Sequence, residues 1–206
     1  MFVTIMFSAR ISGSHFNPCI TFSYMIGNVK HGNFDRILGF LYIAAQVVGA
    51  QLGCIFSNIF AAGQNANINL SISSSDILQQ LTVEVMGSFF LVFMYLSSTD
   101  EKTKFTKDAA IQTIILAGSY LGAMLLAGAK LTSIHASPVN PAIAFAIIVW
   151  NPSKANWGTF YVFIGASFLG SFLALVFFRF IYQKTTETMD QIEEEEDDER
   201  NEDQLL

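Results

Sequence analysis

A short motif that occurs twice, Asn-Pro followed by an apolar run, constrains the fold of this chain most strongly. It lies at Asn140-Pro141-Ala142 and again at Asn17-Pro18-Cys19. Around it, Ser, Asn, Pro, Ile and Phe recur at a constant separation of 123 residues. The side-chain oxygen of Asn can cap a helix, and Pro is readily accommodated at the first helical position. The motif therefore predicts two helices, one beginning at each Asn-Pro pair.

The apolar run after the second motif is too short to cross a bilayer. Residues 142–150 form a run of nine residues, whereas a spanning helix needs roughly 20. Two short, capped helices in corresponding halves of an apolar chain are typical of inverted-repeat membrane proteins, with the pathway between the repeats. The chain is 52% hydrophobic, which is too apolar for an ordinary soluble domain.

The net charge of −6 is unevenly distributed along the 206 residues. Residues 187–206 hold eleven acids and one Arg, whereas residues 1–186 hold ten Lys or Arg and six acids. We therefore predict a membrane channel domain at 1–184 and an acidic, disordered tail at 185–206. The cations are scattered singly, which argues against a nucleic-acid-binding face. Cys19 and Cys54 lie in apolar runs and behave as small hydrophobic residues rather than as a disulfide or metal pair.

Several apolar segments are long enough to span a bilayer. A shorter run at residues 1–9 is interpreted as the end of another membrane helix. Counting Lys and Arg in the connecting loops gives seven on the side of the tail and two on the opposite side. Cytoplasmic loops carry an excess of cations, so the tail is predicted to be cytoplasmic, and the sequon at Asn69 on the opposite side agrees. The predicted spans are 37–62, 77–98, 109–129 and 157–182.

Two polar side chains fall within the predicted spans. Glu84 is either a functional group or a structural acceptor for buried backbone N–H groups, since an unpaired acid at membrane depth is costly. Gln46 either bonds neighbouring helices together or lines a pore. The sequence has three His and offers no nucleophile–base pair and no cluster of metal ligands. We therefore expect no enzyme activity, no cofactor and no metal site.

At this point the motifs resemble those of a known family. The run Ile11-Ser-Gly-Ser-His-Phe-Asn-Pro-Cys-Ile-Thr21 resembles the first signature of the aquaporin/aquaglyceroporin (major intrinsic protein) family, and Val139-Asn-Pro-Ala142 resembles the second. Tyr42-Ile-Ala-Ala-Gln46 is similar to the third helix of that family, and Glu84 to its membrane glutamate. The resemblance implies an all-α inverted repeat of six spans with two re-entrant half-helices, assembled as a homotetramer. Compared with that pattern, the first helix and most of the second are missing, which predicts a truncated member.

The resemblance also implies a passive channel for water and small neutral solutes such as glycerol or urea. The Asn amides would donate to a passing solute, while the positive ends of the two half-helices exclude cations. Ile143 stands where the family usually has Arg, so we predict a wider and less polar outer filter. The expected pore residues are Asn17, Pro18, Cys19, Asn140, Pro141, Ala142, Ser137, Ile143 and Gly128.

Two other functions fit the same sequence. The chain could be a non-conducting truncated subunit that only assembles with or regulates full-length partners. It could instead be an ion-coupled transporter that uses Glu84. His135 could supply a hydrogen-bond donor near the pore mouth or be an ordinary loop histidine.

Overall fold

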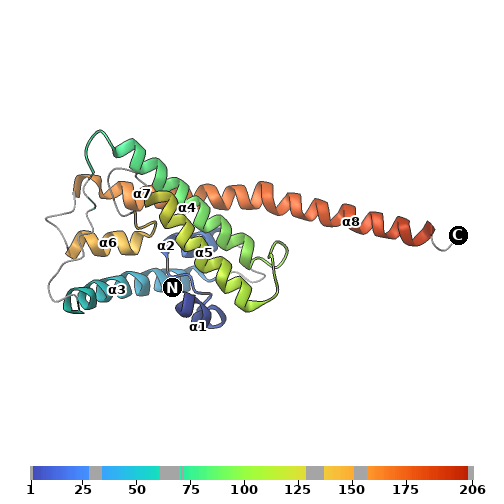
Figure 1. The fold of residues 1–206 in the computed structure, drawn as a ribbon, viewed down its shortest axis with the longest axis horizontal. Helices are drawn as coiled ribbons and strands as arrows, with labels where there is room; N and C mark the ends of the chain where they lie inside the picture. The colour runs from blue at the N-terminus through green and yellow to red at the C-terminus, as the bar shows by residue number, and fades with distance from the viewer. Residues whose placement is uncertain are drawn as a thin grey trace.

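The computed structural model describes residues 2–27, 34–60, 70, 72–128, 137–150 and 157–203. Every regular element in these ranges is helical (Figure 1). The predicted all-α class is therefore confirmed. In chain order the elements are α1 (Phe2–Ser12), α2 (Pro18–Gly27), α3 (Arg36–Phe60), α4 (Ile77–Thr99), α5 (Ala109–Gly128), α6 (Pro141–Trp150), η1 (Trp157–Thr159), α7 (Phe160–Phe177), η2 (Phe178–Tyr182) and α8 (Gln183–Asp203).

Helices α2 and α6 are the two predicted half-helices. Each has ten residues, which corresponds to about 15 Å at a rise of 1.5 Å per residue. Such a helix reaches about half-way across a hydrocarbon core of about 30 Å. Helix α2 begins at Pro18, directly after Asn17, and α6 begins at Pro141, directly after Asn140. The repeated Asn-Pro pair thus marks the start of both elements.

Four helices in the described part of the chain are long and apolar enough to cross a membrane. They are α3, α4, α5 and the run that begins at Trp157. In this last run, α7 continues through the π-helical segment η2 into α8. Large apolar side chains such as Phe40, Leu121 and Phe172 are exposed on the outer faces, as expected where a helix meets lipid rather than water. The protein is therefore a membrane protein.

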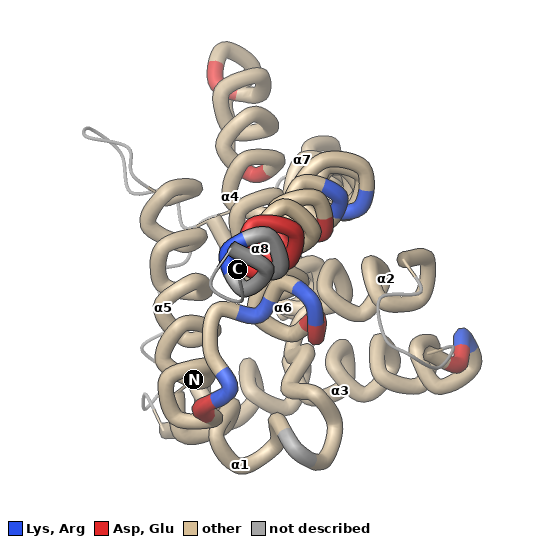
Figure 2. The backbone as a smooth tube through the Cα atoms, turned by 90° about the vertical axis from the view of Figure 1, so that its right-hand side faces the viewer, with Lys and Arg blue, Asp and Glu red and all other residues tan. Residues whose placement is uncertain are grey.

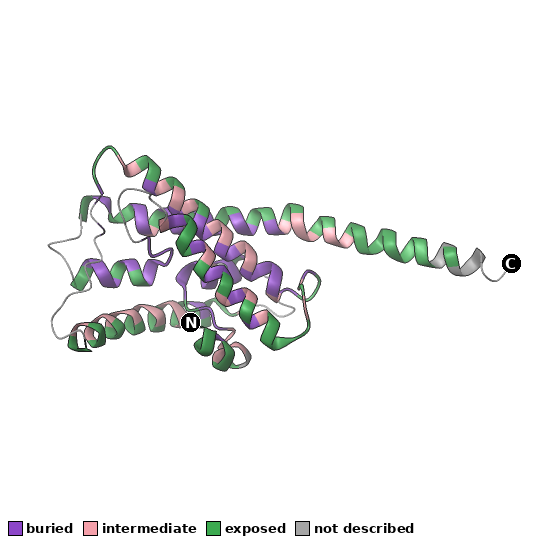
Figure 3. Cartoon of the chain, viewed as in Figure 1, coloured by how far each residue is buried: buried purple, intermediate pink, exposed green. Residues whose placement is uncertain are grey.

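Helix α4 is the central helix of the bundle and packs against both α5 and α7. The contact with α7 is close at Gly170, where an added Cβ would lie 2.3 Å from the carbonyl oxygen of Val85. Small residues allow helix backbones to approach in this way within a membrane. Helix α3 packs against α2 and α6, and of its residues only Gly39 is buried. Figure 3 shows the buried residues gathered in α2, α4, α6 and α7.

Helix α8 differs from the sequence-based prediction. Residues from 185 onward were expected to be disordered, whereas the structure has a helix over Gln183–Asp203 that leaves the bundle (Figure 1). None of its described side chains is buried (Figure 3), so the tail has no core, as its composition predicts. The helix is nevertheless reasonable, because Glu is a good helix former. In addition, α8 extends a helix that already exists and so requires no new nucleation.

Charged residues mark the end of the bundle from which α8 emerges. Lys102 Nζ, in the loop after α4, donates to Glu187 Oε1 in α8 at 2.5 Å. This ion pair places the α4–α5 loop and the start of α8 at the same end of the bundle. Figure 2, viewed from that end, shows Lys and Arg on α8 and near the ends of other helices. The described residues do not include Lys30, Lys130 and Lys154, which are among the loop cations counted from the sequence. They also do not include His135 or the sequon residues Asn69 and Ser71.

Candidate functional site

The two motif asparagines each cap their own half-helix. The Oδ1 atom of Asn17 accepts a hydrogen bond from the backbone N–H of Cys19 at 2.9 Å. The Oδ1 atom of Asn140 accepts one from the backbone N–H of Ala142 at 3.0 Å. Both bonds satisfy a donor that has no partner within the first turn of a helix. The remaining N–H groups of each first turn leave a partial positive charge at the helix start.

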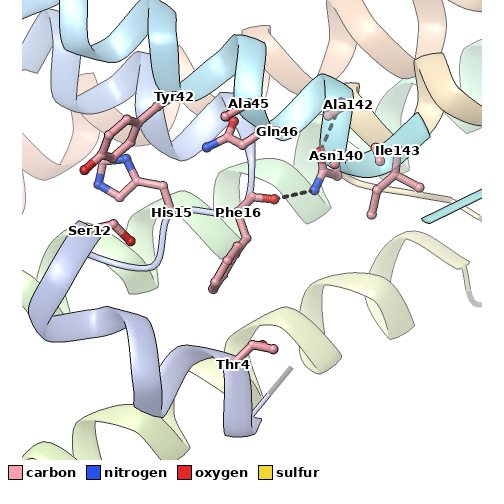
Figure 4. Close-up of a pocket in the computed structure, with 12 residues that line it drawn as sticks. Thr4, Ser12, His15, Phe16, Tyr42, Ala45, Gln46, Asn140, Ala142 and Ile143 are labelled. Carbon is pink, nitrogen blue, oxygen red and sulfur yellow. Dashed lines mark hydrogen bonds between the residues drawn. The ribbon is translucent and has the colours of Figure 1, made fainter. Parts of the chain in front are cut away.

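The same two asparagines also connect the half-helices to one another. Asn17 Nδ2 donates to the carbonyl oxygen of Val139 at 2.8 Å. Asn140 Nδ2 donates to the carbonyl oxygen of Phe16 at 2.9 Å (Figure 4). Both asparagines are buried. Each amide therefore caps its own helix and holds the residue that precedes the other Asn, which fixes the starts of α2 and α6 against each other.

The two residues that receive these bonds have an unusual backbone conformation. Phe16 has φ of 47° and Val139 has φ of 46°, and they occupy equivalent positions in the two repeats. A residue other than glycine in this left-handed region costs about 1–3 kcal/mol, and more so for a β-branched residue such as Val139. The conformation directs each carbonyl toward the asparagine of the opposite motif. The cross-repeat hydrogen bonds thus help to offset the backbone strain.

Glu84 joins three elements inside the bundle. Its Oε1 atom accepts a hydrogen bond from Ser137 Oγ at 2.5 Å, and its Oε2 atom accepts one from Ser167 Oγ at 3.2 Å. The backbone N–H of Val139 also donates to this carboxyl group. Glu84 is fully buried. Of the two roles considered from the sequence, the contacts match an acceptor for buried donors that anchors the loop before α6 to α4 and α7.

A cavity of about 550 Å³ lies beside the starts of the half-helices. Helix α1, the loop before α2, helix α3 and the beginning of α6 form its walls (Figure 4). Its described lining includes both polar and small or apolar side chains, and none of these residues is Lys, Arg, Asp or Glu. The lining residues are Thr4, Ser12, His15, Phe16, Tyr42, Ala45, Gln46, Gly49, Ala50, Asn140, Ala142 and Ile143.

Some of the predicted pore residues line this cavity. Asn140, Ala142 and Ile143 do so, and Ile143, which lies next to Asn140 in Figure 4, has 43% of its surface exposed. Gln46, for which pore lining was one of two alternatives, also lines the cavity. The second Asn-Pro motif therefore faces the cavity, and the Ile143 side chain occupies part of its wall.

Other expected pore residues are not among the described residues that line this cavity, and their place in a pore stays a prediction. Asn17, Pro18, Cys19 and Pro141 are buried and are not among the cavity residues. Helix α2 packs against α7, where Ser171 Oγ donates to the carbonyl oxygen of Cys19 at 2.8 Å. The Ser137 side chain faces Glu84 instead of the cavity, because the carboxylate accepts its hydroxyl proton. Gly128, at the end of α5, is likewise not among the lining residues.

The sequence reasoning gave no role to His15, which lines the cavity. Its Nδ1 atom lies 3.2 Å from Thr21 Oγ1, and that oxygen accepts a hydrogen bond from Gln46 Nε2 at 2.9 Å. The imidazole ring also contacts Tyr24 and Tyr42, with ring centroids 4.6 Å and 5.7 Å away. Gln46 therefore combines the two predicted roles, because it joins α3 to α2 and also lines the cavity. The position of His15 two residues before the capping Asn17 was the signal that could have identified it.

Comparison with known proteins places this geometry in context. A family model described as "Major intrinsic protein" matches residues 1–182. Aquaporin TIP1-1 from Arabidopsis thaliana is 30% identical over 192 residues, covering 90% of this chain and 69% of the relative. Aquaporin TIP1-1 from Zea mays is 28% identical, covering 88% of this chain and 68% of the relative. The solved structure of the aquaglyceroporin from Plasmodium falciparum has the same fold, with a TM-score of 0.67, 20% identity and coverage of 91% of this chain and 80% of that chain.

Proposed function

This chain belongs to the major intrinsic protein family of membrane channels for water and small solutes, and we propose that it conducts water, glycerol and urea passively along the cavity beside α6. The observation that carries the proposal is the pair of capped half-helix starts, tied together by Asn17 and Asn140 at the cavity edge. A passive pore needs no cofactor, no metal and no covalent chemistry. What it needs is a path with hydrogen-bond partners and a barrier to ions.

The ion barrier comes from the two half-helices. Each helix start carries about half of a positive elementary charge, and the reciprocal asparagine bonds hold the two starts close together. Positive ends of half-helices at mid-membrane oppose the passage of cations and protons. None of the described lining residues is Asp or Glu, so no carboxylate on the cavity wall attracts a cation.

The cavity wall offers both hydrogen-bonding groups and apolar contacts. One N–H of the Asn140 amide binds Phe16, and we expect the second N–H to donate to a solute in the cavity. Gln46, Tyr42 and His15 supply further polar groups. Phe16, Ala142 and Ile143 provide apolar surface. A wall of this kind suits neutral molecules that carry both hydroxyl groups and C–H groups, and it also admits water.

Ile143 sets the proposed preference for solutes larger than water. Its uncharged side chain leaves the wall beside Asn140 without a cation. Replacing it with the longer, charged side chain in Ile143→Arg is expected to lower glycerol permeability more than water permeability. Val149→Arg, at an exposed position near the end of the same helix, is the matched control. An equal loss of both permeabilities in Ile143→Arg would contradict the role given to this position.

The orientation and assembly belong to the same proposal. The tail beginning at residue 185 lies on the cytoplasmic side, which is supported by the cation-rich loop around Lys102 at the same end as α8. The protein assembles as a homotetramer with one pathway per subunit, as the family resemblance implies. Labelling of cysteines introduced at Glu194 and Ser74 in sealed vesicles tests the orientation, since only one of the two positions should react from outside.

The experiment that tests the function is stopped-flow light scattering on proteoliposomes. An osmotic step reports water permeability, and a glycerol or urea gradient reports solute permeability. Permeability above that of empty liposomes, with no requirement for an ion gradient, supports the proposal. Permeability equal to that of empty liposomes would favour the non-conducting subunit. The buried position of Glu84, away from the cavity lining, gives no support to ion-coupled transport.

A further inference from the structure

The loop that precedes α2 is the most strained backbone segment in the described part of the chain. Gly13, Ser14 and Phe16 have φ values of 77°, 55° and 47°. For residues other than glycine, each such conformation costs about 1–3 kcal/mol and persists only where the surroundings enforce it. Two residues of this loop, His15 and Phe16, line the cavity. The groups that hold the loop therefore also place part of the cavity wall.

Two buried tyrosines from other helices bind this loop. Tyr120 in α5 donates its hydroxyl proton to the carbonyl oxygen of His15 at 2.6 Å. Tyr95 in α4 donates its own to the carbonyl oxygen of Gly13. Both side chains are almost completely buried. Together with Asn140, which binds the carbonyl of Phe16, they satisfy three carbonyl groups within four consecutive residues.

The equivalent loop before α6 is held by different chemistry. There, the carboxylate of Glu84 accepts hydrogen bonds from Ser137 and from the backbone N–H of Val139. In that loop a single acceptor binds donors, whereas in the loop before α2 two phenol donors bind carbonyl groups. The two loops thus present the same motif but do not share their support.

We propose that Tyr120, assisted by Tyr95, is a positioning residue for solute selectivity. Its hydroxyl fixes the His15 carbonyl, and through it the His15 side chain and the Phe16 carbonyl at the cavity. The inference rests on the proposed channel function. It adds a residue that acts on selectivity through the loop and not by direct contact with the solute. Without the hydroxyl, a buried carbonyl loses its donor and the strained loop can relax toward an ordinary conformation.

The expected consequence is a change in selectivity rather than a uniform loss of flux. Water needs few directional contacts at once, whereas glycerol must match several polar groups on the wall. Tyr120→Phe removes the hydroxyl and keeps the ring, so packing is preserved. We expect the ratio of glycerol to water permeability to fall about five-fold, the size of effect that loss of one net hydrogen bond produces.

The test compares Tyr120→Phe, Tyr95→Phe and Tyr161→Phe in proteoliposomes. Tyr161 is an exposed residue near the start of α7, so its variant controls for loss of a tyrosine hydroxyl. Water and glycerol permeabilities are normalised to the amount of folded protein, measured by size-exclusion chromatography. The Arrhenius activation energy of each flux is recorded as well, because a displaced wall changes it and a smaller amount of protein does not.

The outcomes distinguish failure of the channel function from failure of the positioning role. A wild-type protein without permeability removes the channel function itself. A conducting wild type, with a permeability ratio in Tyr120→Phe and Tyr95→Phe equal to that of Tyr161→Phe, overturns only the positioning role. Failure of both buried variants to fold would assign the tyrosines to folding and would also overturn it. A lowered ratio in either folded variant, with the Tyr161→Phe ratio unchanged, supports the inference.

Discussion

Replacing Asn140 by Asp separates the capping role of this side chain from its role at the cavity. The introduced carboxylate keeps an oxygen where Asn140 Oδ1 accepts the N–H of Ala142 at 3.0 Å. It loses the Nδ2 donor that binds the Phe16 carbonyl at 2.9 Å, a part-buried hydrogen bond whose loss costs about 1–2 kcal/mol. A negative charge at the start of α6 recovers about 0.3–1 kcal/mol from the helix dipole. The net expectation is a destabilisation of about 1 kcal/mol, seen as a fall of about 2–4 °C in the thermal midpoint.

The same substitution should weaken the barrier to cations. A full negative charge is about as large as the partial positive charges of the two helix starts together, each about one half, so the electrostatic barrier is cancelled. At a separation of 4 Å and an effective dielectric constant of about 20, the attraction for a passing cation is about 4 kcal/mol. We therefore expect a leak of protons or potassium that the unmodified protein lacks. Protonation of the introduced carboxyl group removes the charge, so the leak should disappear at low pH.

The assay follows dissipation of a pH gradient and of a potassium gradient in proteoliposomes loaded with a fluorescent indicator. Asn17→Asp is the matched control, because Asn17 has the same cap and the same cross-repeat bond, at 2.9 Å and 2.8 Å, but does not line the cavity. It should be destabilised to a similar extent and should not leak. Equal leaks in both variants, or no leak in Asn140→Asp, would refute the placement of the pathway beside the second motif.

Two further predictions concern the packing and the tail. Gly170→Ala should destabilise the protein by about 1–3 kcal/mol in thermal unfolding, because the new Cβ would lie 2.3 Å from the backbone oxygen of Val85. Gly49→Ala, with no atom within 4 Å of the new Cβ, should be neutral or stabilising by up to about 1 kcal/mol, and an equal loss in both would be contrary evidence. For the tail, the hydrogen bond and charge of Glu187 raise the pKa of Lys102 above its ordinary value. Because the folded-state pKa is raised, the contact is complete below the ordinary lysine pKa and is lost only as pH rises through the raised value. Spin labels on the α4–α5 loop and on α8 should therefore separate at strongly alkaline pH or in high salt, and a constant distance under both conditions would contradict a loop held by this ion pair.

Local sequence signals were sufficient to predict where the helices lie and insufficient to predict which residues contact one another. The Asn-Pro pairs predicted where α2 and α6 begin, because capping and the fixed φ of proline act within one turn. They could not reveal that Asn17 binds the carbonyl of Val139, since that bond depends on how two distant loops meet. Ser137 was expected at the filter, but its hydroxyl binds Glu84. The helical tail was missed because composition reports the lack of a core and not the helix that α8 continues.

The repeated motif also gave an impression of symmetry that the surroundings do not share. Both asparagines cap, both bind across the repeat, and both follow a residue with positive φ. Of the two, however, only Asn140 is among the described residues that line the cavity, and the start of α2 has a bond from Ser171 to the Cys19 carbonyl. The hydrogen bonds to the two preceding loops differ as well. The Glu84 carboxylate accepts bonds from the loop before α6, whereas two tyrosine hydroxyls donate to the loop before α2. A duplicated sequence therefore specifies the two half-helices, while the residues around them differ between the repeats.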